Sequence, residues 1–190
     1  FVSIIGILLL VALVSYSPED PNFIFPENTE IKNILGFQGS YISDLFLQSL
    51  GLISYLVPIT YFFNGIDIFK KKEVFLLIKS TFLIISYSII GSLFFSHFYK
   101  NAFTLYINGN GGFIGNYFNS ILIKNNISPY DNFFYYFFIS LVIFLFLKSI
   151  NFKLANFILT LKKLFVIVFE NKEKNYTNKN EVINEYIPQD

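Results

Sequence analysis

The sequence predicts an all-α membrane protein with four transmembrane helices plus short amphipathic surface helices. Hydrophobic residues make up 54% of the 190 residues and charged residues only 14%, whereas a soluble domain carries about 25% charged residues. The charged residues gather in short blocks that separate long apolar runs. The longest of these runs reach the roughly 20 residues that a helix needs to cross a bilayer.

The composition also excludes several kinds of site. The chain has no cysteine, so it holds neither a disulfide framework nor a thiolate metal site. Its only histidine, His97, ends an apolar run beside Tyr99. A lone histidine there is more typical of a polar anchor at the membrane interface than of a catalyst. We expect no catalytic, cofactor-binding or metal-binding residue in this chain.

The first apolar run covers residues 1–16, which is short for a complete span. Pro18 and Pro21 follow and predict the end of the helix, because proline lacks an N–H donor. An acidic loop over residues 19–32 comes next. We expect Asn33 to cap the helix that follows it.

The second run covers residues 41–69 and is longer than the roughly 30 Å hydrocarbon core requires. Its first turns, with Asp44, should therefore lie at the interface, and Pro58 predicts a kink. An acidic residue at membrane depth is a functional candidate by default. Asp44 and Asp67 fall near the ends of this long helix, however. We expect helix-end solvation or a packing contact for both, in preference to a proton relay.

Two further spans are predicted over residues 74–98 and 130–147. Between them, a Gly-rich break at residues 109–112 precedes a short amphipathic helix, which we expect to lie on the membrane surface or to pack against the bundle. Its apolar face is predicted to consist of Ile114, Phe118, Ile121 and Leu122.

The last part of the chain is more polar. Residues 151–169 carry lysines along one stripe and predict a cytoplasmic interfacial helix, since burying those lysines in a span is costly. Residues 170–190 are polar and are expected to be disordered, as the start of a linker. Residues 1–150 form the predicted four-span domain.

The lysine distribution predicts the orientation. Lys70, Lys71 and Lys72 lie between the second and third runs, and Lys148 ends the fourth. Short loops rich in lysine stay in the cytoplasm. Four spans with both termini cytoplasmic satisfy this rule.

The glycines of residues 109–115 invite a phosphate-loop interpretation. We reject it because no Lys-Ser/Thr pair follows and the spacing does not match a nucleotide-binding loop. A flexible break before a surface helix explains them better.

Three phrases of the sequence resemble the N-terminal four-helix membrane domain of the FtsK/SpoIIIE family of bacterial DNA translocases. The first is Ser-Tyr-Ser-Pro-x-Asp-Pro-x-Phe at residues 15–23, the second covers residues 36–58, and the third is Gly-Gly-x-Ile-Gly at residues 111–115. The positions that carry the resemblance are Ser17, Pro18, Asp20, Pro21, Phe23, Gly36, Gly39, Tyr41, Asp44, Gly51, Pro58, Gly111, Gly112 and Gly115.

The resemblance implies an anchor in the bacterial inner membrane that targets a DNA translocase to the division septum and couples chromosome segregation to cell division. Its implied partners are the lipid bilayer, septal division proteins and further copies of the chain in a hexamer. The family's motor uses ATP and Mg²⁺ and contacts DNA. These 190 residues contain no Gly-x-x-x-x-Gly-Lys-Ser/Thr motif, so we expect no enzymatic activity and no DNA contact from this chain itself.

Two other interpretations stay open at the level of sequence. A small integral membrane transporter or lipid-processing protein would need polar or charged groups that converge at mid-membrane depth, and the runs offer mainly Ser, Tyr and Asn there. A purely structural membrane subunit also fits, although nothing in the sequence identifies one.

Overall fold

The computed structural model describes residues 1–21, 30–99, 107–123, 131–153, 158–159 and 162–166. All regular structure in these residues is helical. The chain divides into two units, residues 1–151 and 152–190. In the second unit, the described residues 158–159 and 162–166 are helical. The interfacial helix predicted over residues 151–169 stays a prediction, and residues 170–190 lie outside the described part of the chain.

The first unit contains six α-helices in its described residues and two short helical segments of other types. The α-helices are α1 (Val2–Val14), α2 (Gly36–Leu50), α3 (Leu56–Lys71), α4 (Phe75–Phe98), α5 (Gly112–Phe118) and α6 (Asn132–Ser149). A 3₁₀ segment, η1 (Gly51–Tyr55), joins α2 to α3, and a π-helical turn, η2 (Asn119–Ile123), extends α5.

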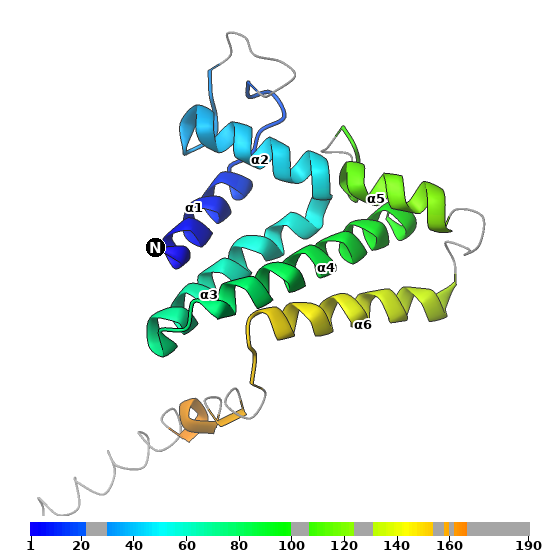
Figure 1. The fold of residues 1–190 in the computed structure, drawn as a ribbon. Helices are drawn as coiled ribbons and strands as arrows, with labels where there is room; N and C mark the ends of the chain where they lie inside the picture. The colour runs from blue at the N-terminus through cyan, green and yellow to red at the C-terminus, as the bar shows by residue number, and fades with distance from the viewer. Residues whose placement is uncertain (22–29, 100–106, 124–130, 154–157, 160–161, 167–190) are drawn as a thin grey trace, which may run out of the picture. The chain divides into compact units, whose positions relative to one another are not determined.

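The helices are long and apolar enough for a multi-pass membrane protein. Three stretches reach the length and hydropathy of a span: Gly36–Lys71 taken through η1, Phe75–Phe98, and Asn132–Ser149; Val2–Val14 is apolar but shorter. Figure 1 shows α3, α4 and α6 running side by side, while α2 and α5 lie at one end of them. The predicted all-α membrane fold is confirmed.

The interior of this bundle contains small polar side chains beside an apolar core that includes Leu13, Leu47 and Tyr87, and its surface is largely apolar. Small polar side chains such as Ser43, Ser54, Thr60 and Ser92 are fully buried, whereas large apolar side chains cover the outside of α4 and α6. A lipid-facing surface has no need of polar groups, and small residues let membrane helices approach closely. This arrangement fits a chain surrounded by lipid.

Two glycines allow such an approach between α1 and α3. A Cβ atom at Gly6 would lie 2.7 Å from the backbone nitrogen of Phe62, and one at Gly65 would lie 2.2 Å from the hydroxyl of Ser3. The Ser3 hydroxyl donates a hydrogen bond of 3.0 Å to the carbonyl of Phe62. The two helix backbones therefore pack nearly without intervening side chains.

The predicted kink at Pro58 is wrong. The chain breaks earlier, at Gly51–Tyr55, and Figure 1 shows α2 turning away from α3 there. Pro58 is the third residue of α3. In the first turn of a helix the missing N–H has no intrahelical acceptor to lose, so proline is tolerated without a kink.

Candidate interaction site at the α2–α5 end

Asp20 closes the loop between α1 and α2. Its side chain is buried, with one oxygen accepting the backbone N–H of Lys32 at 2.8 Å and the other that of Asn33 at 2.9 Å. Hydrogen bonds from backbone amides stabilise a buried carboxylate. The acid in the Ser-Pro-x-Asp-Pro phrase therefore joins the end of the first apolar run to the start of the second.

Asn33 links the same two helices in a way that the sequence did not predict. The first residue before α2 is Leu35, which has no side-chain cap, so the predicted capping role is wrong. The Asn33 amide instead donates to the carbonyl of Ala12 at 2.9 Å and accepts from the backbone N–H of Leu35 at 3.1 Å. Ala12 lies in the last turn of α1, where carbonyls lack an intrahelical partner.

The second and third phrases of the sequence meet at their glycines. Gly51 and Gly112 both have positive φ, at 72° and 62°. A Cβ atom at Gly51 would lie 1.9 Å from the carbonyl oxygen of Asn110, and one at Gly112 would lie 2.5 Å from that of Ser49. An amino acid with a side chain could not adopt this backbone conformation while the neighbouring backbone lies so close. These glycines thus fix where the turn before α5 docks on the α2–α3 break.

Helix α5 packs on α4 through its polar side. Ser96 donates a 2.7 Å hydrogen bond to the side-chain oxygen of Asn116, and His97 Nδ1 lies 3.0 Å from the side-chain oxygen of Asn119. Gly115 lies against the backbone of Ser92. The helix itself is as predicted, but the predicted apolar face does not form the contact, since Ile121 and Leu122 are exposed.

His97 is buried between α4 and the segment that follows α5, and its predicted role as an anchor at the membrane interface stays a prediction. Its Nε2 atom has no hydrogen-bond partner among the described residues. Within the described residues no group of three or more His, Cys, Asp or Glu side chains could hold a metal ion. The contact with Asn119 makes His97 part of the α4–α5 interface.

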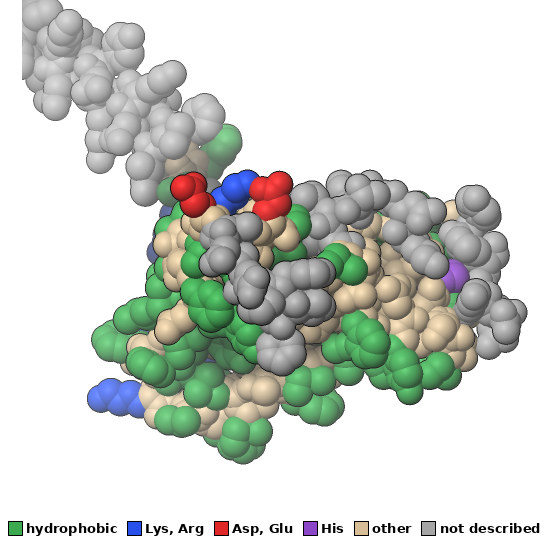
Figure 2. Space-filling model, turned by 90° about the horizontal axis from the view of Figure 1, so that it is seen from above, with side chains coloured by type: hydrophobic (Ala, Val, Ile, Leu, Met, Phe, Trp, Pro, Cys, Tyr) green, Lys and Arg blue, Asp and Glu red, His purple; other side chains and the backbone are tan. Residues whose placement is uncertain are grey.

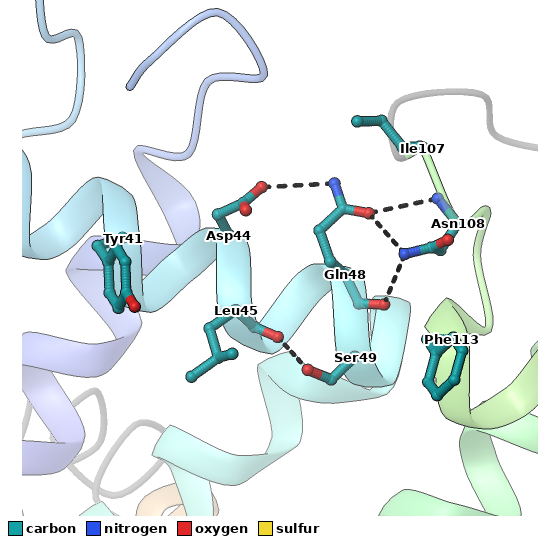
Figure 3. Close-up of a pocket in the computed structure, with 8 residues that line it drawn as sticks. All are labelled: Tyr41, Asp44, Leu45, Gln48, Ser49, Ile107, Asn108 and Phe113. Carbon is teal, nitrogen blue, oxygen red and sulfur yellow. Dashed lines mark hydrogen bonds between the residues drawn. The ribbon is translucent and has the colours of Figure 1, made fainter. Parts of the chain in front are cut away.

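A polar network joins α1, α2 and the turn before α5. Asp44 accepts hydrogen bonds from the Tyr16 hydroxyl at 3.1 Å and from the Gln48 amide at 3.4 Å. Asn108 donates to the Gln48 side-chain oxygen from both its backbone N–H, at 3.3 Å, and its side chain, at 3.2 Å. Figure 3 shows Gln48 between Asp44 and Asn108. The packing contact expected for Asp44 is present.

The surroundings of Tyr16 in this network change its pKa. Burial, and then the charge of Asp44, raise the pKa of Tyr16 to about 12. The phenol therefore stays protonated and donates a hydrogen bond to the side chain of Asp44.

Beside the network lies a pocket of about 560 Å³. Asp44 and Gln48 supply polar groups to it, and Figure 3 shows its lining: Tyr41, Asp44, Leu45, Gln48, Ser49, Ile107, Asn108 and Phe113. Most of the lining is apolar, so the pocket suits a ligand with one polar group and an apolar body.

The positions that carry the family resemblance fall mostly at this end of the bundle. Asp20, Pro21, Gly36, Gly39, Tyr41, Asp44, Gly51, Gly111, Gly112 and Gly115 lie in or beside the contacts described above. Ser17 accepts a hydrogen bond from the backbone of Glu19, Pro18 is exposed, and Pro58 lies apart, against Gly6 of α1. Phe23 lies outside the described residues.

Sequence reasoning missed Asn108 and Ser96. Both are polar residues at the edges of apolar segments and resemble ordinary loop or small-residue positions. The small residues Ser88, Gly91 and Ser92 on α4 indicate close helix packing from the sequence, and Ser96 continues their spacing by one turn.

A second set of polar contacts joins α3, α4 and α6 and extends from the middle of α4 to the opposite end of the bundle. Thr60 of α3 lies 3.0 Å from the Tyr87 hydroxyl of α4 and 3.2 Å from the Ser149 hydroxyl of α6. Asn151 donates to Asp67 at 3.1 Å, and Lys71 forms an ion pair with Asp67 at 3.5 Å. The expected packing contact for Asp67 is therefore also present.

The sequence that forms this bundle matches a known membrane region. The family described as the 4TM region of DNA translocase FtsK/SpoIIIE matches residues 1–154. The chain belongs to this family. The predicted membership is confirmed, and with it an association of the helices with the lipid bilayer.

Relatives of this FtsK/SpoIIIE chain are longer proteins. It is 28% identical over 163 residues to the DNA translocase FtsK of Rickettsia bellii, covering 84% of this chain and 21% of that protein. It is 29% identical over 140 residues to the DNA translocase FtsK of Shewanella oneidensis, covering 68% of this chain and 14% of that protein. No solved structure matches the chain. The chain thus spans about a fifth or less of these relatives.

Proposed function

We propose that this chain is the membrane anchor and septum-targeting region of a DNA translocase that couples chromosome segregation to cell division. The observation that supports this most is the family match over residues 1–154, combined with relatives named DNA translocase that extend well beyond the matched part. Four membrane helices anchor the protein in the bilayer, and catalysis belongs to another part of the whole protein.

The charge distribution supports an anchor over a transporter or lipid-processing protein. Residues 45–66, 80–99 and 132–147 contain no Asp, Glu, Lys or Arg. The two acidic residues with polar contacts, Asp44 and Asp67, lie at opposite ends of the described bundle. Charged groups at mid-membrane depth, which would mark an ion or substrate path, are missing from these segments.

The orientation and the partners are part of the same proposal. Lys70, Lys71 and Lys72 face the cytoplasm, both termini are cytoplasmic, and the α2–α5 end faces away from it. The chain assembles as a hexamer in the inner membrane at the division septum, where it meets division proteins. ATP, Mg²⁺ and DNA are handled by the motor part of the whole protein.

A fluorescent fusion in dividing cells tests this proposal. A fusion of the membrane region, with its natural N-terminus, should gather at midcell, and the reading frame should continue past Asp190 to a Gly-x-x-x-x-Gly-Lys-Ser/Thr motif. A fusion carrying Gly112→Ala, which disturbs the α2–α5 end, is the matched control for targeting. Even fluorescence around the envelope, or a solute flux that depends on this region alone, would contradict the anchor function.

A further inference from the structure

Among the residues that the structure describes, no cationic side chain pairs with Asp44. Its Oδ1 atom accepts hydrogen bonds from two neutral groups, Tyr16 and Gln48, while no hydrogen bond to Oδ2 is present in the described part of the chain. The ion pairs among the described residues are Glu19–Lys32 and Asp67–Lys71. Asp44 is only 4% exposed. Both oxygens of Asp20 accept backbone N–H groups, whereas the two donors to Asp44 reach only Oδ1. The second oxygen of Asp44 is therefore suited to a positively charged donor from a ligand.

The pocket beside Asp44 opens among apolar side chains. Leu45, Ile107 and Phe113 line it and are themselves 57%, 72% and 63% exposed. Figure 2 views this end of the molecule and shows hydrophobic side chains over much of its described surface, with the visible acidic side chains together in one small area. A ligand of this pocket therefore combines a cationic group with an apolar portion.

The depth of the pocket places it among lipid headgroups. Helix α5 packs against Ser92 and Ser96, in the last turns of α4 and far from Lys70–Lys72. The 24 residues of α4 extend over about 36 Å, compared with about 30 Å for the hydrocarbon core. The end of α4, and the pocket with it, thus reaches the interfacial layer of the bilayer.

We infer that this pocket binds the headgroup of an ethanolamine phospholipid, with the primary ammonium on Asp44 and the lipid's apolar part against Leu45 and Phe113. An ammonium carries three N–H donors and a full charge, which supplies both the cation and the hydrogen bond that Oδ2 lacks. Lipid is favoured over a lysine of a protein partner because the apolar rim residues Leu45, Ile107 and Phe113 are exposed, and the acyl part of a lipid would cover them. This inference depends on the membrane fold and not on the proposed septal function.

Lipid retention by the purified chain tests the inference. The chain is reconstituted in vesicles of equal parts phosphatidylethanolamine, its mono- and dimethyl derivatives, phosphatidylcholine and phosphatidylglycerol, and the co-purifying lipid is measured by native mass spectrometry. We expect retention to fall as methyl groups replace N–H donors, with about a tenfold preference for phosphatidylethanolamine over phosphatidylcholine. The methylated series keeps the charge and removes only the donors.

Two variants separate the site from general membrane binding. Asp44→Asn keeps an acceptor for Tyr16 and Gln48 but removes the charge, and it should abolish the preference. Asp67→Asn, at the other end, should leave it intact. Equal retention of the lipids by the natural chain, or a preference that survives Asp44→Asn, would overturn the inference. So would equal competition by soluble phosphoethanolamine or by a lysine peptide, since the ligand would then be a free amine or a protein.

Discussion

The backbone N–H of Leu52 donates a 2.9 Å hydrogen bond to the carbonyl of Asn110, 58 positions later in the chain. This bond joins the break between α2 and α3 to the turn that begins α5. Gly51 and Gly112 flank it, and their backbones approach so closely that neither position has room for a side chain. The two phrases of the sequence that these glycines belong to therefore form one structural unit.

Replacing Gly51 tests this contact. Gly51→Ala should destabilise the chain by on the order of 3 kcal/mol, because the new Cβ atom would collide with the Asn110 carbonyl. Gly36→Ala is the matched control, since Gly36 also has positive φ but no atom within 4 Å of the added Cβ. The control should lose only about 1 kcal/mol. Thermal unfolding in detergent measures both, and equal losses would show that the close approach is unimportant.

Asp20→Asn should destabilise the loop between α1 and α2. Both carboxylate oxygens accept backbone N–H groups, so an amide would turn one N–H donor toward another. We expect a loss of about 1–3 kcal/mol, together with faster hydrogen exchange at Lys32 and Asn33. Glu19→Gln breaks an exposed ion pair with Lys32 and should change stability little. A similar effect of both substitutions would contradict the assigned role of Asp20.

The phenol of Tyr16 should ionise at a higher pH than an ordinary tyrosine. Its pKa is raised from 10.0 to about 12 by burial and by Asp44, so the folded state holds this proton more tightly than the unfolded state. The stabilisation is complete below about pH 10 and is lost as the pH rises toward 12. The absorbance titration curve of Tyr16→Phe is subtracted from that of the natural chain. The difference should show one phenol that ionises near pH 12, and Asp44→Asn should lower the pH of that ionisation. Ionisation near pH 10 in the difference curve would rule this out.

The hydroxyl of Thr60 should matter more than that of Thr81. Thr60→Val removes contacts with Tyr87 and Ser149 on two other helices, whereas the Thr81 hydroxyl bonds only the Leu77 carbonyl of its own helix. We expect a loss of about 1 kcal/mol for Thr60→Val and a smaller one for Thr81→Val. Unfolding in mixed micelles gives both values, and a larger effect at Thr81 would count against the interhelical role.

Single cysteines test the orientation against a background without cysteine. Cysteine at Lys71 should react with an impermeant thiol reagent only after the membrane is opened, whereas cysteine at Glu30 should react in intact cells. Both positions are exposed, so accessibility rather than burial decides the result. Labelling of position 71 from outside would reverse the proposed topology.

The sequence by itself determined the helical membrane class and the ends of α4 and α6 to within two residues. Long apolar runs bounded by lysines or prolines give this information locally, because the bilayer imposes a span length and a charge rule on each run separately. The resemblance to the family was visible for the same reason, since it rests on short phrases.

Only the tertiary structure decided the break at Gly51, the polar side on which α5 packs, and the meeting of Asp44 with Tyr16. Each depends on a partner far along the chain: Asn110 for Gly51, Ser96 for Asn116, and Tyr16 for Asp44. From the sequence alone, a proline inside an apolar run predicts a kink, because it lacks a backbone N–H. Pro58 lies in the first turn of α3, however, where that N–H would have no acceptor within the helix. In lipid, a buried polar group gains by finding a partner within the bundle, and that partner is chosen by packing, which no local pattern encodes.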